Sequence, residues 1–356
     1  MNNKDSCPIA KSLTKKEILA KIPQSKSKQI LITGATSSIG RAIAKILAKT
    51  GKKVKALVRN DSADKLLFEL SAEIITADIN DPETIEWALD NVDEVIHIAK
   101  CHISRSSNKE ELLQTNYLTT KKLVDQSIKN SVKKFIFISD SGFPITAKGE
   151  IATEQSKTFK NHFYYETLNF AEKYIEKMGL DYDFNYLIIA PTFFYGPDCC
   201  RSLTLFDKVI NSKLIIAGSG DTYFQPLFID DLAQAILLAL QNDKLKNQKY
   251  IIAGKEKISI NQFVNGISIE AGKQSSGFNI PPIFPLILAY MFEPLFTLFS
   301  KRPPITFADI DFFIKDRLFE TKKTYQELSF YPEVDFKLGV KKCLEQSSLK
   351  GKLSGS

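Results

Sequence analysis

The 356-residue chain contains little of what marks a secreted, metal-binding or membrane-spanning protein. Its five cysteines are too few and too irregularly spaced for a disulfide framework, which favours a reducing, cytoplasmic location. Its three histidines form no pair at ligand spacing, so we expect no metal site. The polar first 27 residues contain no signal-peptide core, and Pro285, Glu293 and Pro294 interrupt the most apolar segment before it could span a bilayer.

The charge of the chain is also moderate. Its 48 basic and 41 acidic residues give a net charge of +7, and the lysines are scattered without an arginine-rich block. We therefore expect no nucleic-acid partner. With 44% hydrophobic residues the chain can bury a large core, and it shows no internal repeat. Residues 1–27 are predicted to form a polar extension and residues 346–356 a flexible tail.

The first structured segment reads as a strand, a glycine turn and a helix. A strand over residues 30–33 precedes Gly34, which permits a tight turn, and Gly40, which permits close packing of the helix against the strand. The apolar residues of that helix recur every three or four positions. Its N-terminus can therefore offer backbone N–H groups to a pyrophosphate.

The alternation of strands and helices continues along the chain. Further strands are predicted over residues 54–58, 73–77, 94–98, 134–139, 186–190 and 250–252, with helices over 82–89, 116–128 and 231–240 between them. This pattern predicts an α/β fold of the Rossmann type, a doubly wound parallel sheet, over residues 28–254. A smaller C-terminal substrate-binding domain is expected over residues 255–345, and residues 191–229 are expected to contribute to the substrate cleft.

Seven segments then carry a family resemblance. In chain order they are TGATSSIG, ADINDPET, VIHIAK, TNYLTTKKLVDQS, FIFISDSG, APTFFYGP and PLFIDDLAQAILLAL. Together they resemble the extended short-chain dehydrogenase/reductase family, which is the NAD-dependent epimerase/dehydratase-like group, from about residue 29 to 345. The last part of the chain looks most similar to the 3β-hydroxysteroid dehydrogenase branch.

The resemblance implies a dinucleotide cofactor. Where an acidic side chain would bind the adenosine ribose of NAD, the second strand ends at Arg59, which together with Arg41 can pair with a 2′-phosphate. We therefore prefer NADP to NAD, although Arg59 could instead be a solvated surface residue. The other cofactor-binding positions that the resemblance implies, beside Gly34 and Gly40, are Thr36, Ser37 (in place of the middle glycine), Ser38, Ile39, Asp78, Ile79, Ala99 and Pro191.

The catalytic positions depart from the family pattern. In the family that the chain resembles, three side chains share the proton chemistry. A serine holds the substrate oxygen, a tyrosine transfers the proton, and a lysine makes the tyrosine a useful base, because a free tyrosine has a pKa of about 10. The pair Ala171-Glu172 sets the register, which places Tyr164 at the tyrosine and Leu168 at the lysine.

The serine position of the pattern falls on Asp140. This carboxyl could donate a hydrogen bond only when protonated, or it could act as a base. Ser139 and Ser141 flank it, and a slip of one residue would restore a serine there. Asn116 matches the structural asparagine.

Three functions remain open from these residues. The first is an NAD(P)-dependent oxidoreductase acting on a hydroxyl or ketone of a bulky apolar molecule, such as a sterol, a terpenoid or an acyl chain, with Lys173 or the oxidised nicotinamide replacing the lost cation. The second is an NAD(P)-binding regulatory or assembly protein without turnover. The third is a nucleotide-sugar epimerase or dehydratase.

The apolar segment over residues 278–304 has two interpretations. It forms either a buried helical layer or an apolar lid over the substrate, with peripheral membrane contact through residues 278–300. The family resemblance further implies a homodimer, formed through the helices that contain residues 116–128 and 164–177.

Overall fold

The structure is a computed structural model, and it describes residues 29–59, 65–100, 108–142, 144, 149–157, 163–274, 277–298 and 305–346. The predicted N-terminal extension lies outside these residues, and so does the predicted tail except for its first residue.

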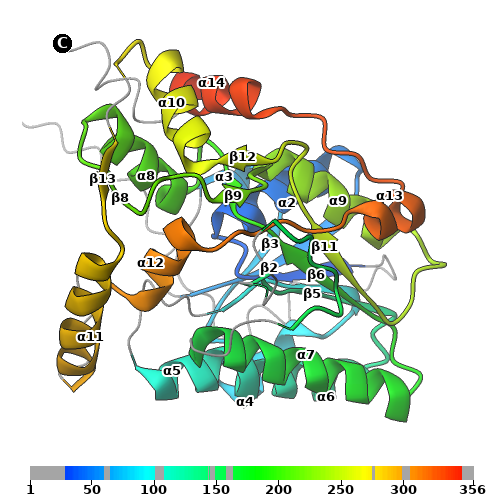
Figure 1. Cartoon of the computed structure of the whole chain (residues 1–356). Coiled ribbons are helices and arrows are strands. Elements are labelled where there is room, and N and C mark those ends of the chain that lie inside the picture. The colour runs from blue at the N-terminus through cyan, green and yellow to red at the C-terminus, as the bar shows by residue number, and fades with distance from the viewer. Residues whose placement is uncertain are drawn as a thin grey trace, which may run out of the picture.

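Seven parallel strands form the central sheet, in the order β11-β6-β5-β4-β1-β2-β3 (Figure 1). The prediction of a doubly wound α/β sheet is confirmed, and strand boundaries differ from the predicted ones by one or two residues. The strand order reverses direction between β1 and β4, which is where such sheets bind ligands at the carboxyl ends of their strands. The strands are β1 (Gln29–Thr33), β2 (Lys53–Val58), β3 (Glu73–Thr76), β4 (Val92–His97), β5 (Lys134–Ile138), β6 (Tyr186–Pro191) and β11 (Gln248–Ile252).

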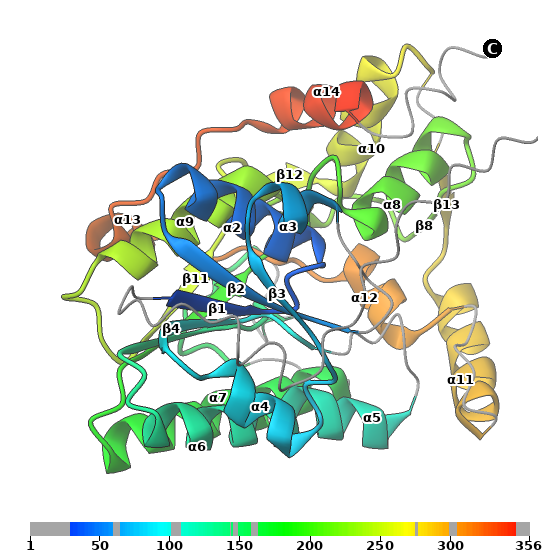
Figure 2. The same ribbon diagram turned by 180° about the vertical axis from the view of Figure 1, so that it is seen from behind.

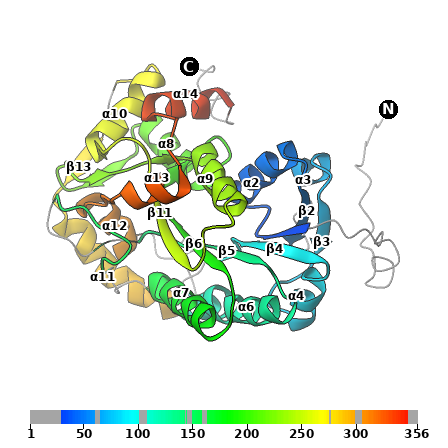
Figure 3. The same ribbon diagram turned by 90° about the vertical axis from the view of Figure 1, so that its right-hand side faces the viewer.

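Helices cover both faces of this sheet (Figures 2 and 3). Successive strand residues point to opposite faces, so Ile30 and Ile32 of β1 join one hydrophobic core while Leu31 joins the other. The first core lies under α2 (Ser38–Lys49), α3 (Lys65–Glu69) and α9 (Ile229–Gln241). The second lies under α4 (Pro82–Ala88), α5 (Lys109–Leu113), the π-helical turn η1 (Gln114–Leu118), α6 (Thr119–Lys129) and α7 (Phe163–Asp181).

A smaller region is assembled from two separate parts of the chain. Short strands that follow β6 pair with strands that follow β11: β8 (Ile215–Ala217) with β13 (Phe278–Ile280), and β9 (Tyr223–Phe224) with β12 (Ile258–Ser259). Its core is rich in aromatic rings, including Phe224, Phe263 and Phe336. The remaining elements are β7 (Phe194–Tyr195), α8 (Cys200–Ile210), β10 (Leu227–Phe228), α10 (Ile260–Glu270), α13 (Lys322–Leu328) and α14 (Phe336–Gln346).

In Figure 1, helix α11 (Ile283–Leu298) lies at one end of this region, next to α12 (Phe307–Ile314). It packs on α12 through a small cluster of Ala217, Ala289 and Ile310. Most large apolar side chains of α11 are exposed, so the prediction of a buried layer is wrong for this helix. Among the residues that the structure describes, no helix is long and apolar enough to cross a membrane.

Candidate active site

The glycine turn lies at the carboxyl end of β1, next to the point where the strand order reverses. Gly34 has φ of +70°, and a Cβ atom there would lie 2.9 Å from the Ala99 nitrogen, so only glycine fits without a shift of the β4 end. At Gly40 a Cβ atom would lie 2.5 Å from the Gly34 carbonyl oxygen. The two glycines thus let helix α2 start against the strand ends, with its N-terminal amides directed at this edge.

Two serines stabilise the turn. Ser37 is the N-cap of α2: its Oγ accepts a hydrogen bond from the Gly40 amide at 3.1 Å and donates one to the Gly34 carbonyl at 2.7 Å. The hydroxyl of Ser38 donates to the Asp198 carbonyl at 2.7 Å, which links the turn to the loop before α8. Ser37, which replaces the middle glycine of the family pattern, therefore stabilises the turn through these two hydrogen bonds. These residues fit a pyrophosphate-binding turn.

The other predicted cofactor positions lie at the carboxyl ends of neighbouring strands. Arg59 is exposed directly after β2, Asp78 is exposed after β3, and Pro191 is buried at the end of β6. The structure therefore brings these positions to one edge of the sheet. Five positions remain. Thr36 and Arg41 are half-buried at the turn and Ile39 is buried in α2, while Ile79 is buried beside Asp78 and Ala99 is half-buried after β4.

Tyr164 and Asp140 form the centre of the candidate site. Tyr164 lies in the first turn of α7 and is completely buried. Its pKa is raised well above the ordinary value, first by burial and then by the charge of the Asp140 carboxylate. Asp140 is held by the Gly142 amide, which donates to its Oδ1 at 2.9 Å. Tyr164 is consequently protonated at neutral pH.

Lys100 supplies a positive charge next to this pair. It follows β4, and its Nζ donates to the carbonyl oxygens of Ser139 at 2.7 Å and Ile138 at 3.3 Å, directly before Asp140. Burial lowers the pKa of Lys100, while the carboxylates of Asp140 and Glu172 act in the opposite direction. The ammonium group therefore lies at the end of β5, where it balances the Asp140 carboxylate.

The predicted serines have different surroundings. Ser139 is buried and its hydroxyl donates to Glu172 Oε1, while Lys249 of β11 donates to Glu172 Oε2 at 2.6 Å. This arrangement joins β5, α7 and β11, and it directs the Ser139 hydroxyl toward Glu172. Ser141 is half-buried, and its backbone amide donates to the Pro191 carbonyl at 3.1 Å.

Leu168 and Lys173 do not provide a cation at the tyrosine. Leu168 lies one helical turn after Tyr164, is 3% exposed and packs in the core under α7. Lys173 is exposed on the same helix. In the described part of the chain, Lys100 is the lysine whose contacts place it at the Asp140 backbone.

A chain of buried hydrogen bonds connects the ends of β1 and β4 to α6 and η1. His97 of β4 joins Thr33 Oγ1 through Nδ1 at 2.6 Å and Thr120 Oγ1 through Nε2 at 2.9 Å. The Thr120 hydroxyl proton is already donated to the Asn116 carbonyl at 2.8 Å, so His97 must donate from Nε2 and accept at Nδ1. The ring is therefore neutral, in agreement with burial lowering the pKa of His97 to about 3.

Asn116 continues this chain to the tyrosine. It is buried in the π-helical turn η1, a feature often found at functional sites. Its Nδ2 donates to Thr167 Oγ1 at 3.1 Å, and the Thr167 hydroxyl donates to the Tyr164 carbonyl at 2.7 Å. Through the contacts of Thr33 and His97, the chain connects the end of β1 to the first turn of α7.

Two arginines approach the site from the smaller region. Arg317 is buried, its guanidinium lies 4.0 Å from the Phe312 ring centre and 5.1 Å from that of Phe224, and it donates to the Phe312 carbonyl at 3.0 Å. Burial lowers the pKa of Arg317 to about 10, and its charge interacts with Tyr165 and Arg201. Arg201, on the first turn of α8, also interacts electrostatically with Tyr164.

Sequence reasoning missed several of these residues. Lys100, Arg201 and Arg317 lie far from Tyr164 in the chain, and no spacing links them to it. The lysine in VIHIAK was a usable signal, because it lies one position beyond Ala99 in a segment already assigned to the cofactor edge.

The chain is similar to a known family and to several known proteins. Residues 30–253 match the NAD dependent epimerase/dehydratase family. The chain is 27% identical over 267 residues to UDP-glucose 4-epimerase of Vibrio cholerae, covering 71% of this chain and 79% of the relative. It is 23% identical over 313 residues to sterol demethylase protein B of Methylococcus capsulatus, covering 85% and 93%.

Solved structures show the same fold. The crystal structure of UDP-glucose 4-epimerase from Thermotoga maritima with UDP-glucose superposes with a TM-score of 0.74 at 20% identity, covering 91% of this chain and 99% of that one. At this identity the likeness concerns the fold.

Proposed function

The chain belongs to the NAD dependent epimerase/dehydratase family, and from this we propose that it is an NAD(P)-dependent oxidoreductase in which Asp140, Tyr164 and Lys100 carry the proton chemistry. The observation that supports this most is the buried Tyr164 hydroxyl within the electrostatic influence of Asp140, with Lys100 held at the backbone directly before Asp140, at the cofactor edge of the sheet. A protein that only bound the cofactor would not need a half-buried carboxylate and a half-buried ammonium there, because each costs free energy to desolvate.

Each group has a proposed part in alcohol oxidation. NAD(P), held at the glycine turn of Gly34 and Gly40, would supply the acceptor for the hydride of the substrate carbon. The substrate hydroxyl gives its proton to the Tyr164 oxygen, and Tyr164 gives its own proton to the Asp140 carboxylate. The reverse path delivers a proton to the substrate oxygen during carbonyl reduction. Lys100 holds the backbone directly before Asp140 in place, because its ammonium donates to the carbonyl oxygens of residues 138 and 139.

The cofactor is proposed to be NADP in preference to NAD. Arg59 is exposed at the end of β2, where a 2′-phosphate of the adenosine ribose would lie in this fold. An Arg59→Ala variant should therefore weaken NADPH binding by about 1 to 3 kcal/mol and leave NADH binding nearly unchanged. Equal losses for both cofactors would contradict the preference.

The substrate is proposed to be a hydroxyl compound with a bulky apolar body. The rings of Phe193, Phe224 and Phe312 pack against one another in tilted and edge-to-face contacts, with ring centres 5.4 to 5.7 Å apart, next to Arg317. The similarity to sterol demethylase protein B favours the same class.

The charges of Arg201 and Arg317 favour a second candidate. Two guanidinium groups near Tyr164 and Tyr165 suit an anionic substrate, including a nucleotide sugar such as the one bound by the Thermotoga maritima epimerase.

One experiment tests these proposals together. The purified protein is titrated with NADPH and NADH by fluorescence and then assayed with apolar secondary alcohols, ketones, their carboxylated analogues and UDP-glucose. Tyr164→Phe should lower turnover about 100- to 10,000-fold, and the matched Tyr165→Phe variant should lower it much less. Cofactor binding without turnover of any compound would favour the regulatory alternative, and turnover that Tyr164→Phe does not change would refute the proton path.

A further inference from the structure

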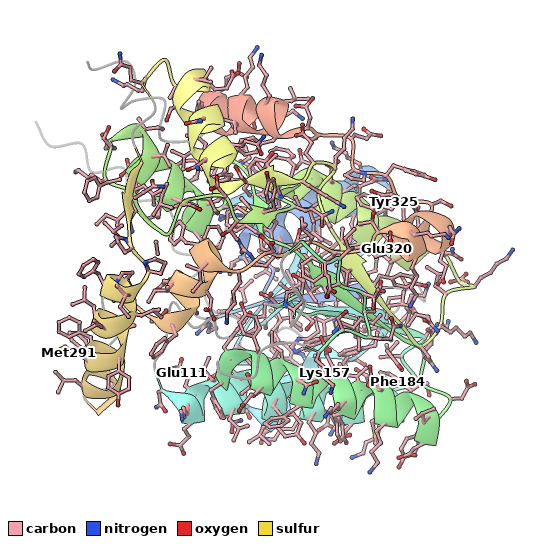
Figure 4. The ribbon with its side chains drawn as sticks, in the orientation of Figure 1. Glu111, Lys157, Phe184, Met291, Glu320 and Tyr325 are labelled. Carbon is pink, nitrogen blue, oxygen red and sulfur yellow. The ribbon has the colours of Figure 1, made fainter. Side chains whose placement is uncertain are left out.

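One edge of the smaller region is built from exposed apolar side chains. Nine of the eighteen exposed large hydrophobic residues in the described part of the chain lie on β8, β13 and α11. We refer to them as the apolar edge: Ile215, Phe278, Ile283, Phe284, Ile287, Leu288, Tyr290, Met291 and Leu295. Figure 4 shows Met291 on the side of α11 that faces away from the rest of the chain.

The apolar edge is continuous in two elements. Phe278 and Ile215 are register partners in the β13–β8 pair, so their side chains lie on the same face, where they are 69% and 56% exposed. On α11, the exposed residues recur at spacings of three and four, which gathers them on one broad side. The opposite side holds Ala289, which is fully buried against Ala217 and Ile310.

The solvent-facing side of α11 is apolar, which is unusual for a surface helix. A helix on the surface of a soluble protein normally presents charged residues to solvent and apolar residues to the core. Residues 283–292 of α11 contain no charged side chain, so the helix is apolar on both sides. Apolar patches of this extent usually mark an interaction surface.

The charges around the apolar edge favour an anionic lipid surface as its partner. Lys208, Lys213 and Lys273 are exposed in the segments that lead into β8 and β13. Residues 208–220 and 273–292 contain no acidic residue, and the whole chain carries a net charge of +7. An apolar surface flanked by lysines is attracted to anionic headgroups while its side chains enter the acyl boundary.

The length of α11 determines how it would lie. Its 16 residues extend for about 24 Å, and the helix is not long and apolar enough to span a bilayer. Tyr290 is the most exposed residue of the apolar edge, and tyrosine rings favour the interface between headgroups and acyl chains. The helix therefore suits a position parallel to the membrane plane.

We propose that the protein binds the surface of anionic membranes through the apolar edge and its flanking lysines. The edge is joined to the candidate site through α12, because α11 packs on α12 and Phe312 of α12 lies against Arg317. Membrane binding does not depend on the proposed reaction, and it is measured without substrate.

Vesicle flotation tests the proposal with the full-length chain. Vesicles of phosphatidylcholine alone are compared with vesicles that also contain phosphatidylglycerol. The protein should float with the mixed vesicles, and the triple variant Phe284→Ser, Ile287→Ser, Met291→Ser should lower its partition coefficient at least about a hundredfold. The matched control Phe68→Ser, Leu180→Ser removes side chains that are 78% and 88% exposed elsewhere, and it should bind normally.

The lysines are tested separately. Lys213→Gln with Lys273→Gln should lower the partition coefficient by roughly thirtyfold, at about fivefold for each lost lysine, and added salt should weaken wild-type binding. Circular dichroism confirms that each variant is folded. Absence of flotation by the wild type, or an equal loss in the control variant, overturns the proposal. A third outcome also overturns the proposal: light scattering shows that the wild type is a dimer, the dimer does not float, and the triple variant is monomeric. The apolar edge would then be a subunit interface.

Discussion

Replacing Lys100 with methionine should slow turnover while leaving the fold nearly as stable as a matched variant. Methionine keeps the unbranched apolar stem and removes the ammonium that donates to the carbonyls of residues 138 and 139. These two hydrogen bonds hold the backbone directly before Asp140, and a displacement of about 1 Å at a reacting group can cost about a hundredfold in rate. Because the proposed path needs the Asp140 carboxyl group in place, we expect kcat of alcohol oxidation to fall about 10- to 100-fold.

Lys55→Met provides the matched control. Lys55 is another buried lysine whose pKa burial lowers, and its Nζ also donates to a backbone carbonyl at 2.7 Å, that of Asp90. It lies on β2, away from the candidate site. The two variants should therefore lose similar stability in thermal unfolding, and only Lys100→Met should lose activity.

The pH profile separates a charge effect from a packing effect. Because burial lowers the pKa of Lys100, its ammonium loses its proton below 10.5, the ordinary value for lysine. The wild-type rate should fall as the pH rises through this lowered pKa, and Lys100→Met should lack that alkaline limb. Equal rates in the two lysine variants, or an alkaline limb that survives in Lys100→Met, would refute the role of Lys100.

Three further predictions concern the support of the site. In the folded protein His97 has a pKa of about 3 and stays neutral above it, whereas in the unfolded chain it is protonated below about pH 6.5. Protonation of the unfolded chain should therefore lower the free energy of unfolding by about 3 kcal/mol between pH 7 and pH 4.5. In denaturant unfolding His97→Gln should show a smaller loss over the same range; an unchanged loss would assign it to other groups. Lys249→Met leaves the Glu172 carboxylate without its partner at 2.6 Å and should cost about 2 to 3 kcal/mol, which Glu172→Gln should partly restore in the double variant. Leu168→Lys buries an ammonium one turn from Tyr164; it should cost about 2 to 4 kcal/mol and lower the tyrosine pKa, and an unshifted tyrosine titration in ultraviolet difference spectra would show that the two groups do not interact.

The central sheet could be predicted from the sequence because its signals are local. The strand predicted over residues 30–33 is β1 (Gln29–Thr33), and the one predicted over 54–58 is β2 (Lys53–Val58). The glycine turn was predictable for the same reason, since Gly34 and Gly40 act within a few residues of themselves.

The catalytic surroundings could not be predicted, because they depend on contacts between distant segments. Lys100 reaches the carbonyls of residues 138 and 139 only because β4 and β5 are neighbours in the sheet. In the smaller region, strands of two or three residues such as β8 and β12 are too short to carry a pattern. The apolar segment of α11 suggested burial among other possibilities, because a sequence shows which side chains avoid water but not what covers them.

The buried chain from Thr33 through His97, Thr120 and Asn116 to Thr167 limits how the protein can diverge. Each hydroxyl in it donates one proton and accepts another, and the histidine is held in one tautomer, so no member can change its donor or acceptor character alone. A homologue with a different residue at position 97 should also differ at position 33 or 120. These positions should therefore vary together in an alignment of relatives, because each side chain restricts which donors and acceptors its neighbour can carry.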